Sequence, residues 1–326
     1  MRIELLRTSL KGFAVGTGII FGLGMTPVPP GWNLGRVTNA LVPSSAAQLA
    51  KLSASIEKMG SPLKNWGLFN KQGPSHIHAP EAWTLTDGKR GVIVAVIDTG
   101  IDPVHNALMM NLWRNPNSAP GKPEWGWNFI TDTPNPTDEH GHGTHVSGII
   151  GALSDPERGI SGVAHQVSIM PVKYYSERNS GEANLRNTVR AIHYAIDHGA
   201  KIINYSGGGP EFSEDEYLAI KRAEARGILF VAAAGNEGAN IDLSEHYYYP
   251  SAYRLSNIIS VAATDIHNEL LPTSNWGKTR VDLTAPGESI FSTLPGNRTG
   301  MMSGTSRSST AVPPASCPAG CATGSR

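Results

Sequence analysis

Three residue types that can activate a hydroxyl nucleophile occur in three separate short motifs. Asp98 lies in VIDTG, His142 in HGHGTHVSG and Ser306 in SGTS. In such a set the serine oxygen attacks a carbonyl carbon, the imidazole takes its proton, and the carboxylate orients the imidazole and stabilises its cation. Asn236 in AAAGNEG is a candidate donor to the developing oxyanion. Together the four residues predict a site for acyl transfer.

Each of these residues, taken alone, also has an ordinary structural explanation. A buried carboxylate such as Asp98 can be satisfied as a cap by nearby backbone N–H groups. Asn236 follows a glycine, as turn residues do, and most serines lie at the surface. The α/β-hydrolase elbow Gly-x-Ser-x-Gly is not met, because Ser308 stands at its last position. The order Asp, His, Ser along the chain therefore carries more weight than any single motif.

The histidine motif contains three imidazoles, and this number invites a zinc site. His140, His142 and His145 are separated by glycines at 141 and 143. Zinc accepts histidine ligands readily, but this spacing does not set three side chains on one face of a helix. The glycines instead indicate a backbone that turns tightly into a helix with His142 at its start. His145 is then expected to point into the fold as a packed, hydrogen-bonded residue.

Six motifs, in the same order, resemble those of the subtilase family of serine peptidases. They are VIDTGID, HGHGTHVSG, INYSGGGP, AAAGNEG, TAPG and SGTS, and they extend over about two-thirds of the chain. The resemblance implies a serine endopeptidase that cleaves peptide bonds through an acyl-enzyme. Asp98 would orient His142, His142 would act as general base, and Ser306 would be the nucleophile. Asn236 and the backbone N–H of Ser306 would form the oxyanion hole.

The resemblance also implies where a substrate would bind. Residues 206–208 would pair with the substrate backbone as an edge strand. Residues 233–235 would form the other wall of the pocket for the residue before the cleaved bond. The predicted substrate-binding residues are Ser206, Gly207, Gly208, Ala233, Ala234 and Gly235. Related proteins often have a larger apolar residue where this chain has Gly207, so a more open pocket is expected. Polypeptides are the expected substrates, and a flexible loop is the alternative for the glycine run.

A parallel α/β sheet is the framework that would bring these residues together. Residues 91–97 form an uninterrupted apolar run that ends at Asp98, as strands buried on both faces do. Similar runs recur at 167–172, 201–205, 228–233 and 258–262, with helical patterns between them. This alternation predicts a mainly parallel sheet flanked by helices, the three-layer subtilisin-like α/β fold. Asp98, Ser206 and Asn236 follow strand ends, where functional groups gather in such sheets.

The resemblance stops after Ser306. Family members continue into a buried helix, whereas this chain reads RSSTAVPPASCPAGCATGSR, and its adjacent prolines oppose a regular helix. The sequence therefore predicts an incomplete catalytic domain at 80–306, truncated or frameshifted after the catalytic serine, and a disordered tail at 307–326. Because that helix normally places the nucleophile, weak or no activity is expected. A non-catalytic remnant that at most binds peptides is the alternative function.

The N-terminus has the features of a targeting segment. Basic residues precede an apolar stretch at 12–25, which predicts a signal peptide or membrane anchor over residues 1–30. The chain is therefore expected to be exported, as a secreted, periplasmic or membrane-anchored protein. Residues 31–79 are interpreted as a pro-segment or linker.

Composition adds few constraints. The 326 residues carry a formal net charge of zero, which gives no reason to expect a nucleic-acid partner. A nucleotide-binding α/β domain is disfavoured because no phosphate-loop signature is present. The two cysteines, Cys317 and Cys321, cannot form a disulfide framework through the main body.

The chemistry requires no cofactor. Subtilases often bind structural calcium, and Asp132 and Asp138 lie in a polar loop, but their spacing assigns no ligand set.

Overall fold

The computed structural model describes residues 63–70, 73, 75–119 and 125–311. All of them belong to one unit of the chain, residues 34–326, while a second unit, residues 1–33, lies outside the described part. The predicted signal peptide or anchor at 1–30 therefore falls outside the described residues. Within the described ranges, no helix is long and apolar enough to cross a membrane.

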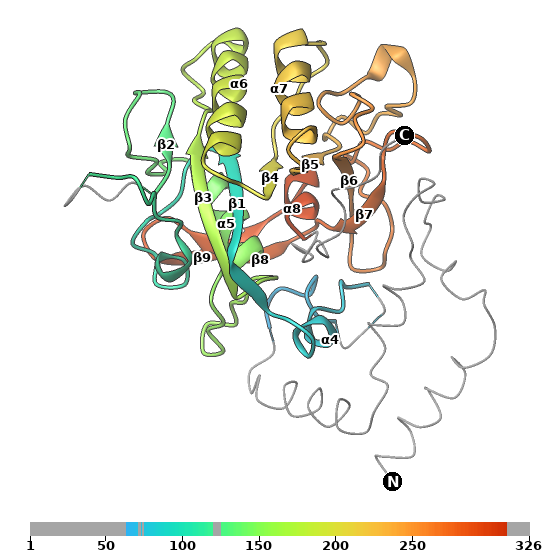
Figure 1. Cartoon of the computed structure of the whole chain (residues 1–326). Coiled ribbons are helices and arrows are strands. Elements are labelled where there is room, and N and C mark those ends of the chain that lie inside the picture. The colour runs from blue at the N-terminus through green and yellow to red at the C-terminus, as the bar shows by residue number, and fades with distance from the viewer. Residues whose placement is uncertain (1–62, 71–72, 74, 120–124, 312–326) are drawn as a thin grey trace. The chain divides into compact units, whose positions relative to one another are not determined.

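A parallel sheet of seven strands forms the centre of this unit (Figure 1), in the order β2-β3-β1-β4-β5-β6-β7. Each neighbouring pair runs parallel. In chain order the strands are β1 (Gly88–Asp98), β2 (Trp127–Asn128), β3 (Gln166–Lys173), β4 (Ile202–Tyr205), β5 (Leu229–Ala233), β6 (Ile258–Thr264) and β7 (Leu283–Pro286). A separate antiparallel hairpin consists of β8 (Ile290–Leu294) and β9 (Arg298–Met302). The predicted α/β fold with a mainly parallel sheet is confirmed.

Helices cover both faces of the sheet (Figure 1). The helices of the described ranges are α4 (Ala79–Trp83), α5 (His142–Gly151), α6 (Gly181–Asp197), α7 (Glu214–Glu224) and α8 (Thr305–Thr310), with short 3₁₀ turns at Met109–Asn111 and Ser244–His246. Helices α6 and α7 pack together on one face. Helices α5 and α8 pack on the other face, next to the β8-β9 hairpin.

The uninterrupted apolar run of β1 follows from burial on both faces. Successive strand side chains point in opposite directions, so alternate residues join different cores. Ile97 packs in the cluster that includes Ile192 of α6 and Ile220 of α7. Val96 packs in the cluster that includes Val146 of α5. Both sides of β1 must therefore be apolar up to Asp98, where the strand ends.

Helix α8 corrects the predicted tail. The sequence predicted disorder from residue 307, but residues 307–310 are helical and buried. The Ser and Thr side chains among them are small enough to fit against the sheet. Two of these donate hydrogen bonds to carbonyls one turn back: Ser309 Oγ to Ser306 O at 3.2 Å and Thr310 Oγ1 to Arg307 O at 2.6 Å. The prolines at 313 and 314 come after the last turn, so they do not interrupt it. Residues 312–326 lie outside the described residues.

The described part of the predicted pro-segment or linker packs on the same unit. Leu68 is buried in a cluster with Ile149 of α5 and Ile290 of β8. Trp66 Nε1 donates to Glu288 O at 2.9 Å. Residues 63–70 therefore contribute to the core, which a flexible linker would not do.

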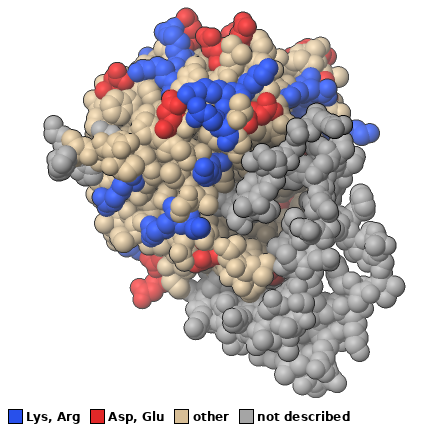
Figure 2. Space-filling model, viewed as in Figure 1, with Lys and Arg blue, Asp and Glu red and all other residues tan. Residues whose placement is uncertain are grey.

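Charged side chains of both signs are interspersed on the face shown in Figure 2. This distribution agrees with the formal net charge of zero. The face in view carries no continuous basic stripe of the kind that tracks a phosphate backbone.

Candidate active site

Asp98 and His142 meet at the carboxyl edge of the sheet. Asp98 is the last residue of β1 and is buried, and its Oδ1 lies 2.7 Å from His142 Nδ1. His142 is the first residue of α5. Because an ionised carboxylate can only accept a hydrogen bond, Nδ1 carries the proton and donates a hydrogen bond to Asp98. This leaves Nε2 as the basic atom of the imidazole. The predicted pairing of these two residues is present.

Two glycines make this approach possible. Gly141 precedes α5 with φ of 100°, a left-handed conformation that glycine adopts without strain. A Cβ on Gly143 would lie 2.2 Å from Gly100 O and 3.2 Å from Asp98 Cβ, so only glycine lets the start of α5 come this close to the end of β1. The glycines therefore set the histidine against the aspartate, as the motif predicted.

Asp138 holds this arrangement together, although sequence reasoning considered it only for a metal. Its Oδ1 accepts from Gly141 N at 2.8 Å and from Thr99 Oγ1 at 2.9 Å, and its Oδ2 accepts from Thr144 N at 2.9 Å and Thr144 Oγ1 at 2.6 Å. Burial alone would raise the pKa of Asp138, but these hydrogen bonds lower it below its usual range. The sequence feature that could have indicated this role is an acidic residue just before the start of a helix, where the backbone N–H groups are unpaired.

His145 occupies the interior, as predicted. It is fully buried, and its Nε2 lies 3.3 Å from Gly300 O. Burial lowers the pKa of His145 to about 3, so the ring is neutral at ordinary pH. Within the part of the chain that the structure describes, no three His, Cys, Asp or Glu side chains gather as a metal site requires.

Ser306 lies beside Asn236 at the start of α8. Asn236 follows the end of β5, and its Oδ1 accepts from Thr305 N at 3.0 Å and from Thr305 Oγ1 at 3.2 Å. A Cβ on Gly304 would lie 3.2 Å from the same oxygen, so the turn before α8 runs close to Asn236. With its oxygen engaged by α8, the amide nitrogen of Asn236 remains to donate elsewhere. The structure thus ties Asn236 to Thr305, the residue before Ser306, and the oxyanion-hole role of Asn236 stays a prediction.

Arg307, which sequence reasoning placed in the tail, occupies the centre of the site. Its Nη1 lies 3.0 Å from His142 Nε2. Ser306 Oγ instead donates to Ser206 O at 3.2 Å, so the hydroxyl and the imidazole do not pair. Arg307 is buried; burial lowers its pKa to about 10, and the Asp98 carboxylate opposes that shift. No feature of the sequence alone pointed to this contact.

The two predicted walls of the substrate pocket follow neighbouring strands. Residues 206–208 come after β4 and residues 233–235 lie at the end of β5, and the two strands pair with Tyr205 opposite Ala232. Gly209 forms an antiparallel bridge to Tyr249, with N···O distances of 3.0 and 2.8 Å. The walls are therefore adjacent, and the carbonyl of Ser206 reaches Ser306.

Tyrosine side chains fill the space beside these glycines. A Cβ on Gly207 would lie 2.1 Å from Tyr174 Oη, and one on Gly208 would lie 2.4 Å from Tyr248 Cε1. A Cβ on Gly235, in the opposite wall, would lie 3.0 Å from Tyr248 Cγ. The expectation that Gly207 opens the pocket is wrong, because the Tyr174 hydroxyl takes the space of a side chain there.

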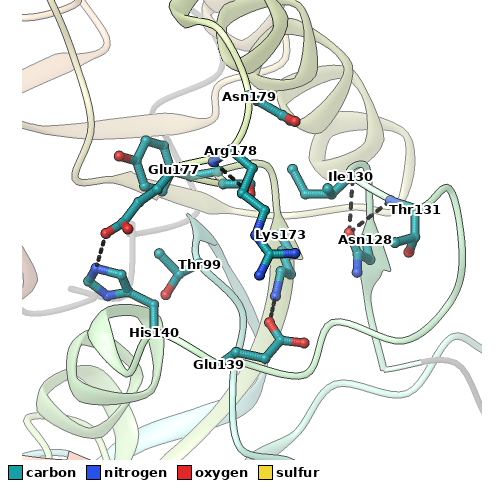
Figure 3. Close-up of a pocket in the computed structure, with 12 residues that line it drawn as sticks. Thr99, Asn128, Ile130, Thr131, Glu139, His140, Lys173, Glu177, Arg178 and Asn179 are labelled. Atoms are coloured by element: carbon teal, nitrogen blue, oxygen red, sulfur yellow. Dashed lines mark hydrogen bonds and ion pairs between the residues drawn. The ribbon is translucent and has the colours of Figure 1, made fainter.

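A cavity of about 600 Å³ is lined by Thr99, the residue after Asp98, and by His140, two residues before His142. Figure 3 shows its lining side chains. The cavity is bounded mainly by loops that follow β1, β2 and β3, and charged groups ring it. Glu177 pairs with His140 at 3.4 Å, and buried Lys173 pairs with Glu139 and donates to Thr137 O at 2.7 Å. Sequence reasoning did not find this cavity, because its lining residues are far apart in the chain: Thr99, Asn128, Ile130, Thr131, Glu139, His140, Lys173, Tyr175, Ser176, Glu177, Arg178 and Asn179.

A family model described as the subtilase family matches residues 89–315. The chain belongs to the subtilase family. It is 36% identical over 234 residues to thermitase of Thermoactinomyces vulgaris, covering 72% of this chain and 76% of thermitase. It is 38% identical over 239 residues to the major intracellular serine protease of Bacillus subtilis, covering 72% and 70%. It is also 34% identical over 277 residues to a thermophilic serine proteinase of a Bacillus species, covering 85% of this chain but 64% of that protein.

Solved structures agree with a subtilisin-like fold for this subtilase. A cold-adapted subtilisin-like serine proteinase superposes with a TM-score of 0.57 at 28% identity, covering 69% of this chain and 73% of that one. A lanthipeptide protease superposes with a TM-score of 0.59 at 25% identity, covering 72% and 74%. The relatives include proteins named intracellular serine protease, so family membership does not decide whether this subtilase is exported.

The two loop carboxylates considered for calcium do not fit one metal site in this subtilase. Asp138 gives both oxygens to the chain around His142. Asp132 accepts from Arg190 Nη2 at 2.7 Å and from Trp127 Nε1 at 3.1 Å. Structural calcium therefore stays a prediction with no ligands assigned.

Proposed function

We propose that this chain is a serine endopeptidase that hydrolyses peptide bonds through an acyl-enzyme on Ser306. The observation that carries the proposal is the 2.7 Å pairing of Asp98 with His142 Nδ1, at the sheet edge where Ser306 and Asn236 also lie. This pairing fixes the tautomer in which Nε2 can accept a proton. The subtilase relatives are named as serine proteases, which supports the same reaction class.

The chemical roles follow from the positions of the side chains. Ser306 Oγ would turn from Ser206 O towards His142 Nε2, lose its proton there and attack the substrate carbonyl. The amide of Asn236 and the backbone N–H of Ser306 would donate to the oxyanion. His142 would then return the proton to the leaving amine, and water would release the acyl group by the same route.

The polypeptide would lie along residues 206–208, with the side chain before the cleaved bond between this segment and residues 233–235. The strand edge offers backbone groups for β-pairing. The charged cavity beside Thr99 and His140 could take another substrate side chain, since these lining residues are near Asp98 and His142 in the chain.

A fluorophosphonate probe and a denatured casein substrate test this proposal. Wild type should be labelled at Ser306 and should release peptides, however slowly, while Ser306→Ala should do neither. Absence of both signals from every folded variant with Ser306 intact would contradict the proposal.

A second candidate function is peptide binding without cleavage. Arg307 favours this function, because its guanidinium is hydrogen-bonded to His142 Nε2, the atom that would take the serine proton in a reaction. In that case wild type and Ser306→Ala would bind a peptide with equal affinity, and neither would turn it over.

Export is part of the proposal and rests on the N-terminal sequence alone. Expression in a bacterial host with sequencing of the mature N-terminus tests it. A product that retains residue 1 and stays in the cytoplasm would contradict it.

A further inference from the structure

Arg307 stands where the hydrogen bond between nucleophile and base is needed. In the described structure, His142 Nε2 accepts from Arg307 Nη1 at 3.0 Å, while Ser306 Oγ bonds to Ser206 O. His142 Nδ1 is already committed to Asp98. Both ring nitrogens are therefore engaged, and neither is engaged by the serine.

This contact opposes catalysis for two physical reasons. The neutral imidazole has one acceptor atom, and a guanidinium stays protonated and can only donate. While Arg307 donates to Nε2, His142 cannot take the proton of Ser306. In addition, the imidazolium that forms during the reaction would lie 3.0 Å from a second cation in a buried site, where repulsion is weakly screened.

The contact does not resemble a structural anchor. Arg307 is 3% exposed, its Nε has no hydrogen-bond partner, and its Nη2 faces Met302 Sδ at 2.9 Å. Among the described residues, no carboxylate forms an ion pair with it. A buried, incompletely paired cation costs stability, and an apolar residue of similar volume would fill the space at lower cost. Stability therefore does not account for an arginine at this position.

We propose that Arg307 is an inhibitory side chain that holds the general base His142 in an inactive arrangement. The proposal rests on the proposed peptidase function, because His142 must be the base for the contact to matter. The proposal predicts the effect of replacing Arg307 by a side chain of similar length that has no hydrogen-bond donor. His142 Nε2 should then be free to accept the proton of Ser306.

Substitution at position 307 tests the effect on reactivity. Arg307→Met keeps the length and removes the donor, whereas Arg307→Lys keeps a cationic donor. Fluorophosphonate labelling of Arg307→Met should be at least about 100-fold faster than that of wild type, the usual contribution of a general base. Labelling of Arg307→Lys should stay close to wild type. Arg298→Met, at an exposed arginine on β9, is the matched control and should not change the rate.

A second readout is independent of catalysis. Diethyl pyrocarbonate transfers a carboethoxy group to an unprotonated imidazole nitrogen and releases ethanol and CO₂. In the Ser306→Ala background, His142 should be modified at least about 10-fold faster when Arg307 is replaced by Met, because the blocked nitrogen becomes available. The exposed His246 provides the internal reference in each sample. Circular dichroism and thermal unfolding establish that each variant is folded.

The outcomes separate the two proposals. Equal His142 modification with and without Arg307 overturns the inhibitory role, whatever the peptidase activity. A second outcome is that His142 is modified faster in the Arg307→Met variant while no variant is labelled by the fluorophosphonate. This result would confirm the contact between Arg307 and His142 but contradict the peptidase function, and with it the inhibitory role. Equal labelling of wild type and Arg307→Met retains the peptidase and overturns the inhibition.

Discussion

Asn236, the side chain proposed for the oxyanion hole, would have two functions. Asn236 accepts from Thr305 through its oxygen and would donate to the oxyanion through its nitrogen. The first contact ties the end of β5 to the start of α8, and the second would act only during the reaction. Substitutions that remove one function and keep the other can separate positioning from catalysis.

Asn236→Ala should lower kcat by about 10²–10³-fold with little change in KM, because one oxyanion donor is lost. The measurement is peptide hydrolysis in the Arg307→Met background, where the base is free. Asn236→Asp keeps the acceptor for Thr305 but loses the donor, so its kcat should fall at least as far. A kcat for Asn236→Asp near that of Asn236 itself would show that the amide does not bind the oxyanion.

Sequence reasoning could propose residues whose chemistry is tied to their type. Asp98, His142, Ser306 and Asn236 could be chosen because acyl transfer needs a carboxylate, an imidazole, a hydroxyl and an amide. Arg307 could not be found in this way, because its effect depends on where α8 directs it. Its role is visible only in the 3.0 Å contact with His142.

At the scale of elements, the loop before α5 is held by hydrogen bonds to one carboxylate. Asp138 accepts from backbone and side-chain donors on both sides of His142 and from Thr99, the residue after Asp98. The start of α5 and the end of β1 are thereby joined independently of the Asp98–His142 hydrogen bond. This connection explains how His142 keeps its position before any substrate binds.

Asp138→Asn should destabilise the fold by about 2–4 kcal/mol near pH 7. The asparagine NH₂ group would face N–H and O–H groups that also donate, so their hydrogen bonds would be lost. The pKa of Asp138 is lowered in the folded state, so its stabilising effect is present above its usual pKa and is lost as pH falls through the lowered value. Urea unfolding at pH 7 and pH 3 should show the difference from wild type shrinking in acid. Hydrogen bonds from Trp127 and Arg190 also lower the pKa of Asp132, but this carboxylate is exposed, so Asp132→Asn should show a weaker change of the same sign.

Tyr248 should determine which residue precedes the cleaved bond. Its ring lies against both Gly208 and Gly235, the two proposed walls of that pocket. In the Arg307→Met background we expect cleavage after glycine or alanine. Tyr248→Ala should raise the kcat/KM ratio for phenylalanine over alanine by at least about 10-fold. Tyr247→Ala is the neighbouring control, and an unchanged ratio in Tyr248→Ala would mean that the side chain binds elsewhere.

For the whole molecule, the fold was readable from the sequence wherever burial imposes a pattern. The apolar run that ends at Asp98 predicted β1 because both of its faces are covered. Helix α8 gave no such signal, since its Ser and Thr side chains are small and polar although they are buried. The charged cavity beside Thr99 gave none either, because loops from separate strands combine to form it.

The stability of the whole unit should also depend on a buried acid in α7. Glu216 is 3% exposed and accepts from Tyr253 Oη at 2.8 Å. Burial raises the pKa of Glu216 to about 7, although the Tyr253 hydrogen bond lowers it. The unfolded chain ionises this group from about pH 4.5, while the folded chain keeps it protonated until about pH 7. Stability should therefore fall between these values, by about 3 kcal/mol in total.

Glu216→Gln should remove this dependence, because glutamine does not ionise. Urea unfolding of wild type should give a free energy of unfolding about 2.5 kcal/mol lower at pH 8 than at pH 5 from this group, relative to the change in Glu216→Gln. Glu214→Gln, at an exposed position of the same helix, should keep the wild-type dependence. If wild type and Glu216→Gln lost the same stability between pH 5 and pH 8, the buried carboxyl would have to ionise in the fold as it does in water. The contact with Tyr253 would then have to stabilise the charged form enough to offset burial.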